Sequence, residues 1–124
     1  MIVFGNIQAQ GVVRTDTIQT TNSLKTFNTT IYSDSLSSSF YIVVPAEVKL
    51  HKHEHHTEQV VILSGEAEMH LGEKVYFIKA GDVIFIPSNT PHSVKVTSKE
   101  PLKLISIQAP YFDGKDRVML DQKQ

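Results

Sequence analysis

The feature that most constrains the fold is a long series of short β-forming runs with no helical period. Between residues 40 and 107, apolar and β-branched segments alternate with Gly, Pro, Asn and Asp punctuation. Proline cannot donate to a ladder and glycine suits turns, so these residues separate strands. Many short, regularly spaced strands are typical of a β-sandwich or barrel. We predict an all-β chain, with helix confined to a turn or two. The expected strands are 40–44, 48–53, 58–63, 66–71, 75–78, 83–86, 92–96 and 102–107.

A length of 124 residues fits a single domain that can bury a core without covalent staples. The division expected over 1–124 is an amino-terminal arm with short strands (1–39), a conserved barrel (40–107) and a carboxyl-terminal tail (108–124). The chain contains no cysteine, which excludes disulfides, zinc fingers and cysteine nucleophiles.

Charge is balanced and interspersed, with 12 Lys and Arg residues against 13 Asp and Glu residues. No basic stripe indicates a nucleic-acid partner, and no polybasic segment or membrane-spanning run indicates a membrane. The first residues lack the pattern of a secretory signal peptide. We therefore expect a cytoplasmic protein that binds neither nucleic acid nor membrane.

Four residues have the chemistry and spacing of a metal site: His51, His53, Glu58 and His92. Alternate residues of a strand share a face, so two histidines one residue apart can aim their imidazoles at one point. Glu58 is in phase with Val60, which turns its carboxylate inward, where a cation is the simplest partner. Three imidazoles and one carboxylate suit a divalent first-row transition ion. We predict one such ion, with Mn, Fe, Ni, Zn and Cu left open.

Two segments carry a resemblance to a known family. The first runs from Pro45 through His51-Lys-His53 to Glu58 and Gly65, and the second runs from Gly81 through Pro87-Ser-Asn-Thr-Pro to His92. In this pattern the chain resembles the cupin family over roughly residues 40–107. The resemblance implies a double-stranded β-helix, a jelly roll of two antiparallel sheets, with the metal at the barrel mouth.

Three positions depart from the family pattern. Pro45 replaces the glycine that opens the first motif, and Val96 replaces an asparagine that often ends the second. Asn89 stands where the family usually has glycine. Asparagine is the next best residue in the left-handed conformation, so the turn is expected to survive.

Similar single-domain cupins include dioxygenases, sugar or keto-acid isomerases and lyases, so the resemblance implies a metal-dependent enzyme that acts on a small organic molecule. Glu58 is the catalytic candidate, through proton exchange if it loosens from the metal. The alternatives are a non-enzymatic module that binds or senses a small molecule, and a barrel whose metal only stabilises it. Substrate-binding residues are not identified, and fold does not choose among these functions.

The sequence also predicts where several other histidine and aromatic residues lie. His55 and His56 are expected at the surface or entrance, with an outer-shell or substrate contact by His55 as the alternative. The aromatic residues Tyr41, Tyr76, Phe77 and Phe85 are expected in the core. The segment 108–117 carries no recognisable mechanism.

A homodimer is also predicted. The runs 60–63 and 83–86 are apolar on both faces, and an antiparallel sheet normally leaves one face in water. Val61 and Leu63 are the outward candidates, and a second copy is the expected cover. The arm at residues 1–23, expected to hold one or two short strands, is the intramolecular alternative.

Overall fold

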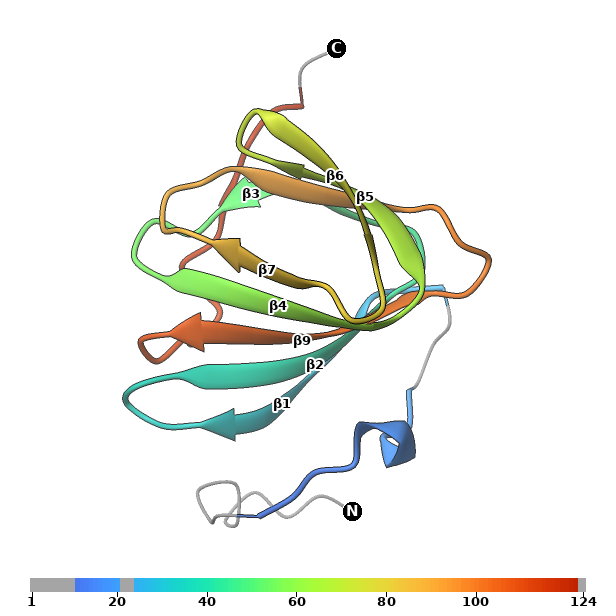
Figure 1. Cartoon of the computed structure of the whole chain (residues 1–124). Coiled ribbons are helices and arrows are strands. Elements are labelled where there is room, and N and C mark those ends of the chain that lie inside the picture. Colours follow the sequence, from blue (N-terminus) through green and yellow to red (C-terminus); the bar gives the residue numbers. More distant parts are fainter. Residues whose placement is uncertain (1–10, 21–23, 123–124) are drawn as a thin grey trace.

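The computed structural model describes residues 11–20 and 24–122, which form two antiparallel β-sheets facing one another (Figure 1). A single 3₁₀ turn, Thr15–Thr17, precedes the strands within this part of the chain. The strands are β1 (Phe27–Ser33), β2 (Ser38–Val44), β3 (Glu47–Lys52), β4 (Thr57–Ser64), β5 (Glu66–Leu71), β6 (Lys74–Lys79), β7 (Val83–Ile86), β8 (His92–Val96), β9 (Leu102–Ala109) and β10 (Val118–Met119). The prediction of an all-β fold is confirmed. In the described ranges no helix is long and apolar enough to cross a bilayer.

The two sheets have five strands each. One has the order β1-β2-β9-β4-β7 and the other β10-β3-β8-β5-β6, so strands distant in the sequence lie side by side. We call these sheet A and sheet B. Strand β1 and the two-residue β10 are elements that the sequence analysis did not place. Residues 11–20 of the expected arm contain no strand, and residues 1–10 and 21–23 lie outside the described part.

Strand alternation divides the barrel interior into an apolar end and a polar end. Along β9, Leu102 and Leu104 are buried at one end, and Ser106 and Gln108 are buried at the other. Strand β4 lies beside β9 in matching register, with Ile62 opposite Leu104 and Glu58 opposite Gln108. The inward rows of both strands therefore change from apolar to polar in the same direction, which places the functional groups together at one end.

The core fills the apolar end. Its buried residues are Val44, Val60, Ile62, Ala67, Met69, Ile78, Ile84, Ile86, Leu102 and Leu104. Gly65 closes β4 onto β5 with a φ of +88°, and a Cβ there would lie 2.5 Å from the Pro101 carbonyl oxygen. Only glycine meets both conditions without strain, because a positive φ is unfavourable for residues with a side chain and their Cβ would clash with Pro101.

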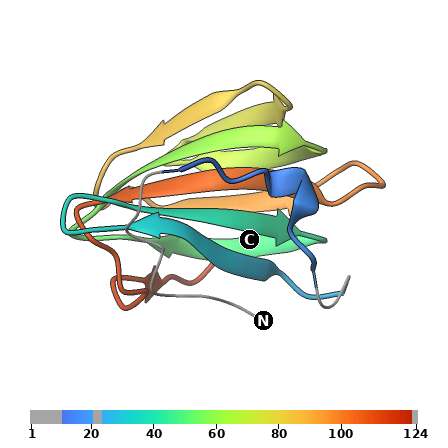
Figure 2. The ribbon, with the colours of Figure 1, turned by 90° about the horizontal axis from the view of Figure 1, so that it is seen from below.

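The outer face of sheet A is covered at one side only. Residues 11–20 cross the outside of this sheet (Figure 2), and the charge of Asp16 adds to burial in raising the pKa of Tyr41. At the other side, Leu63, Val83 and Phe85 remain exposed. The expectation that aromatic residues fill the core therefore holds for Tyr41 and is wrong for three others. Those three are Tyr76, Phe77 and Phe85, all exposed.

Candidate metal centre

Three histidines converge at the polar end of the barrel. His51 and His53 come from β3 and the residues that follow it, and His92 opens β8 directly opposite His51 in the ladder. All three are 3–4 % exposed, and one ring nitrogen of each lies within 4.8 Å of those of the other two. The alternation that the sequence predicted therefore brings these imidazoles to one point.

Backbone carbonyls fix the orientation of each imidazole. Nδ1 of His51 donates to the Lys49 carbonyl at 2.7 Å, and Nδ1 of His92 donates to the Thr90 carbonyl at 2.9 Å. Nδ1 of His53 donates to the Asp116 carbonyl at 2.6 Å. A carbonyl can only accept, so each Nδ1 carries the proton and each Nε2 keeps a lone pair. Metal-binding histidines typically have this arrangement.

Glu58 lies beside two of the imidazoles. Its Oε1 atom is 3.4 Å from Nε2 of both His53 and His92, and its Oε2 accepts a 2.5 Å hydrogen bond from Ser106. The carboxylate is buried, and Oε1 lacks a hydrogen-bond donor among the described residues. Two nitrogen lone pairs and a carboxylate oxygen repel one another unless a cation lies among them. The donor set therefore fits a divalent first-row ion.

The same contacts shift the pKa values within the cluster. Burial opposes charge on Glu58, but the neighbouring His53 and His92 imidazoles and the Ser106 hydroxyl outweigh it and hold its pKa below the ordinary value. Burial likewise opposes charge on His53, yet the bonds to Glu58 and the Asp116 carbonyl raise its pKa. Burial, with the nearby His92, lowers the pKa of His51 to about 4. The cluster therefore shares protons unevenly, and His51 stays neutral.

The loop of the second motif contacts the first. Asn89 adopts a φ of +65°, as its replacement of glycine predicted, and its N–H donates to the His53 carbonyl at 2.6 Å. The turn that precedes His92 is thereby fastened to the end of β3. The two motifs form one unit although Asn89 and His53 are 36 positions apart in the sequence.

The carboxyl-terminal tail, residues 109–122, completes the site. Its β10 pairs with β3, with Met119 opposite His51, and its Phe112 ring packs edge-on against His53 at 5.4 Å. The Asp116 carboxylate accepts bonds from the N–H groups of Glu54 and His55, at 2.9 and 2.8 Å. The tail is thus hydrogen-bonded to the loop that follows His53.

His56 fastens the same contact. Its Nδ1 lies 2.6 Å from the Asp116 carboxylate and its Nε2 lies 2.8 Å from the Tyr111 carbonyl oxygen. Burial opposes charge on Asp116, but the bonds from His56, Glu54 and His55 lower its pKa to about 2. An outer-shell contact was one of the roles expected for His55, but its side chain is exposed. The side chain that links the loop to the tail is that of His56.

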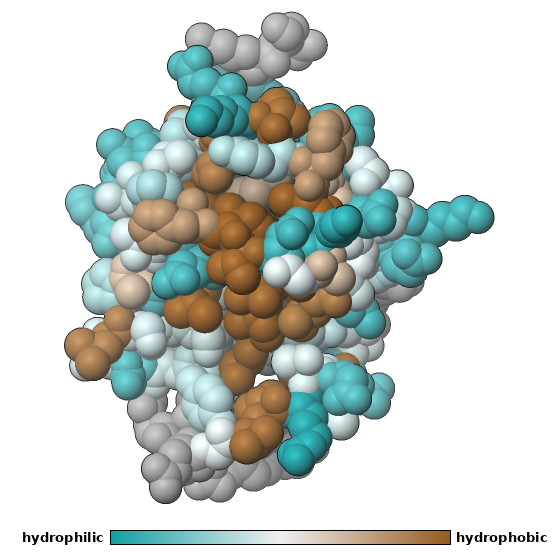
Figure 3. All heavy atoms as spheres, in the orientation of Figure 1, coloured by the Kyte–Doolittle hydropathy of each residue, from teal (hydrophilic) through white to brown (hydrophobic). Residues whose placement is uncertain are grey.

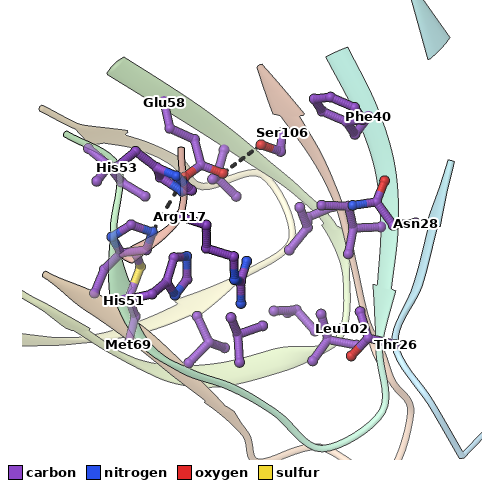
Figure 4. A pocket seen from close by; sticks show the side chains of 18 of the residues that line it. Thr26, Asn28, Phe40, His51, His53, Glu58, Met69, Leu102, Ser106 and Arg117 are labelled. Atoms are coloured by element: carbon purple, nitrogen blue, oxygen red, sulfur yellow. Dashed lines mark hydrogen bonds and ion pairs between the residues drawn. The ribbon is translucent and has the colours of Figure 1, made fainter. Parts of the chain in front are cut away.

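A pocket of about 360 Å³ opens in front of the histidines (Figure 4). Seen in the orientation of Figure 1, hydrophobic side chains gather in the middle of the molecule, flanked by hydrophilic ones (Figure 3). The polar lining includes Ser106, Gln108 and Arg117, which the sequence analysis did not assign to the site. The inward phase of β9 could have predicted the first two, because they continue the row of Leu102 and Leu104. No pattern in the sequence indicated Arg117.

Comparisons with known proteins agree with this architecture. Residues 40–108 match the model of the cupin domain family. An uncharacterized protein of Methanocaldococcus jannaschii is 31 % identical over 93 residues, which cover 73 % of this chain and 74 % of that protein. Mannose-1-phosphate guanylyltransferase RfbM of Salmonella typhimurium is 38 % identical over 72 residues, 57 % of this chain but only 15 % of the enzyme.

A solved structure shows the same fold. A conserved protein with a double-stranded β-helix domain from Klebsiella pneumoniae superimposes with a TM-score of 0.77 at 22 % identity, covering 91 % of this chain and 99 % of that one. The predicted double-stranded β-helix is confirmed. With a family match over more than half of its length and three histidines able to hold a metal ion, the chain belongs to the cupin domain family.

Proposed function

We propose that this cupin is a metal-dependent enzyme that acts on a small organic molecule inside the barrel. The observation that carries the proposal is the position of the donor cluster. The Nε2 atoms and the Glu58 carboxylate lie at the wall of a pocket of about 360 Å³, large enough for a small ligand. A metal held there would face the cavity and keep a coordination position for a ligand, as catalytic sites do.

The proposed ligands are His51, His53, Glu58 and His92, and the ion is one of Mn, Fe, Ni, Zn or Cu. When bound, the ion would supply Lewis-acid polarisation of a substrate oxygen. Glu58 is proposed to exchange protons with the substrate, supported by the Ser106 hydroxyl on its second oxygen. Gln108 is buried, its Oε1 lacks a hydrogen-bond donor among the described residues, and it is placed to orient a ligand hydroxyl.

The reaction class is proposed to be that of a dioxygenase, or of a sugar or keto-acid isomerase or lyase. The test is to load the purified protein with each metal in turn. Oxygen consumption is then followed with an electrode in the presence of diols, thiols and keto-acids, and isomerisation or elimination of the same compounds is followed by NMR. Turnover that requires metal and disappears in His53→Ala supports the proposal. Absence of turnover across this panel with fully loaded protein would count against it.

A second candidate is a non-enzymatic module that binds or senses a small molecule. It is favoured by the sparse acid–base equipment of the pocket. Apart from the proposed ligands, its ionisable lining residues are Glu47, Lys49 and Arg117, and neither cation is an effective proton acceptor near neutrality. Tight binding of a compound that is released unchanged would favour this function over catalysis.

The guanylyltransferase activity of the Salmonella relative gives little guidance to the reaction. The chain spans about one seventh of that enzyme's length, and the proposed function rests on the site of this chain alone. A cytoplasmic location likewise stays a prediction, as does the division of 1–124 into arm, barrel and tail.

A homodimer is proposed through the uncovered side of sheet A. Val83 and Phe85 are 63 % and 56 % exposed, and Leu63 on the neighbouring strand is 39 % exposed. Residues 11–20 cross the same outer face away from the exposed side chains of β4 and β7, so the cover that the chain itself provides is partial (Figure 2). A second copy with the same face would remove these side chains from water in a closed two-fold arrangement.

A further inference from the structure

Arg117 is the only arginine among the residues that line the pocket, and Arg14 is the only other arginine in the chain. Its side chain extends from the tail into the cavity that His51 and Glu58 also line (Figure 4). Burial lowers the pKa of the Arg117 guanidinium, and the charge of Glu58 opposes this shift. The guanidinium therefore belongs to the same cavity as the proposed metal ligands.

This guanidinium has no anionic partner within ion-pair distance among the described residues. Its side chain makes no hydrogen bond there either, although the backbone N–H of Arg117 donates to the Lys115 carbonyl at 2.8 Å. A guanidinium presents five N–H donors in a rigid fork. Arg117 is itself exposed, so its fork reaches into the cavity from the open side, over an apolar floor, and a ligand is the natural acceptor.

The charge balance of the pocket also favours an anion. Its lining contains two cationic residues, Lys49 and Arg117, and two carboxylates, Glu47 and Glu58. Glu47 is exposed at the rim, and Glu58 is turned toward the histidines. A divalent ion at the histidines would add two positive charges and leave the cavity cationic. An anionic ligand would neutralise that excess where field lines concentrate.

We propose that Arg117 recognises the carboxylate of a small organic acid, and that the same ligand presents a second oxygen to the histidine cluster. This inference rests on the proposed function, because it places the ligand between Arg117 and the proposed metal. The uncharged body of the acid would lie over apolar lining residues such as Ile42, Val60 and Leu104.

A carboxylate fits this pocket better than a phosphate. A planar carboxylate pairs with the guanidinium fork through two parallel hydrogen bonds. A phosphate dianion calls for more donors than one arginine offers. The remaining polar lining, including Asn28 and Gln108, is uncharged and suited to hydroxyl groups of the ligand (Figure 4).

The test uses mandelate and its uncharged amide, mandelamide, as matched probes. Both present a hydroxyl and a carbonyl oxygen to a metal, and they differ in charge. Dissociation constants are measured by calorimetry on zinc-loaded and metal-free full-length protein. We expect zinc-loaded wild type to bind mandelate at least about tenfold more tightly than mandelamide, as a charged hydrogen bond predicts.

Two substitutions at Arg117 and two controls identify the source of this preference. Arg117→Gln should weaken mandelate binding by about tenfold and leave mandelamide binding unchanged. Arg117→Lys should restore part of the loss, because lysine keeps the charge but lacks the fork. Arg14→Gln removes the other arginine and Lys115→Gln removes an exposed charge from the same tail; both should bind as wild type does.

Three results would overturn the inference: wild type that does not distinguish the two probes, Arg117→Gln that keeps the preference, or phenyl phosphate that binds more tightly than mandelate through Arg117. Zinc content is measured on the same samples. Wild type without zinc refutes the proposed metal-dependent function, whereas the Arg117-dependent preference is still scored on the metal-free protein. The two failures are therefore distinguishable.

Discussion

The barrel wall and the tail contribute to one site by different means. The wall, formed by β3, β4 and β8, holds three of its four donors on strands and the fourth, His53, directly after β3. The tail, residues 109–122, is held by the two-residue β10 and by the contacts of Asp116 and His56. The wall offers the proposed metal-binding atoms, and the tail supplies the Arg117 cation and the carbonyl that orients His53. We infer that metal retention depends mainly on the wall and ligand selection mainly on the tail.

The largest effect is expected from removing a wall ligand. His53→Ala deletes one of the converging Nε2 atoms, and we expect the purified protein to lose most of its metal. Elemental analysis of protein loaded with zinc or manganese measures this. His70→Ala is the matched control, because His70 is exposed on β5 and away from the cluster. Equal metal content in the two variants would contradict the assignment of the wall.

The next largest effect is expected from acid, which should release the metal ion from the wall residues. Imidazoles must be neutral to bind a metal, so we expect release between pH 7.5 and about pH 5. The metal-free protein should also lose stability in acid. The folded pKa of His51 is about 4 against an ordinary 6.5, so the unfolded chain binds more protons as the pH falls through that window.

The lowered pKa of Glu58 acts in the same direction at lower pH, since its contribution is present above its ordinary value of 4.5 and is lost in stronger acid. The raised pKa of His53 opposes both, because its contribution is complete below 6.5 and fades as the pH rises. On balance we expect the melting temperature of metal-free protein to drop by roughly 5 °C or more between pH 6.5 and pH 4. Calorimetry at several pH values measures it, and a flat profile would contradict the prediction.

A smaller effect is expected from loosening the tail. Asp116→Ala removes the carboxylate that holds the loop after His53. The backbone carbonyl at position 116, which orients the His53 imidazole, should then be held less firmly. We expect metal affinity to fall by about tenfold, the usual effect of losing an outer-shell partner. Competition with a chelator measures the affinity, and Asp121→Ala, an exposed tail aspartate, is the control. A loss as complete as that of His53→Ala would show that the tail holds the metal as strongly as the wall does.

The smallest effect on the site is expected from the outer face. Val61→Glu places a charge beside Leu63 on the uncovered side of sheet A and should weaken the proposed dimer while metal content stays unchanged. Light scattering at micromolar concentration measures the mass. Phe77→Glu adds the same charge on sheet B and should leave the mass unchanged. A wild-type particle with the mass of one chain would reject the dimer.

The same contrast explains how much the sequence could predict. Period-two alternation placed His51 and His53 on one face and Glu58 in phase with Val60, and the structure has these residues buried together. The left-handed turn at Asn89 also followed from residue chemistry. Wall residues were accessible to prediction because strand geometry repeats every two residues.

The tail was not predictable in this way. Asp116 meets the loop at His55 and His56 across about sixty positions of sequence, through contacts that follow no period. The exposed aromatic Phe85 was misplaced for a related reason, since alternation identifies two faces of a strand but not which face is covered. The functional roles of the site residues remain predictions for the experiments above.

The order of strands in sheet A has a consequence for how the molecule is made. Strand β9 lies between β2 and β4, so the sheet is interrupted until residues Leu102–Ala109 arrive. During synthesis from the amino terminus, β2 and β4 therefore wait with unpaired edges until β9 is made, which begins 38 positions after the end of β4. Long-range pairing of this kind slows folding, and waiting edges invite association with other chains. We expect insertion of β9 to be a late folding step and the interval before it to be when the nascent chain is most prone to aggregate.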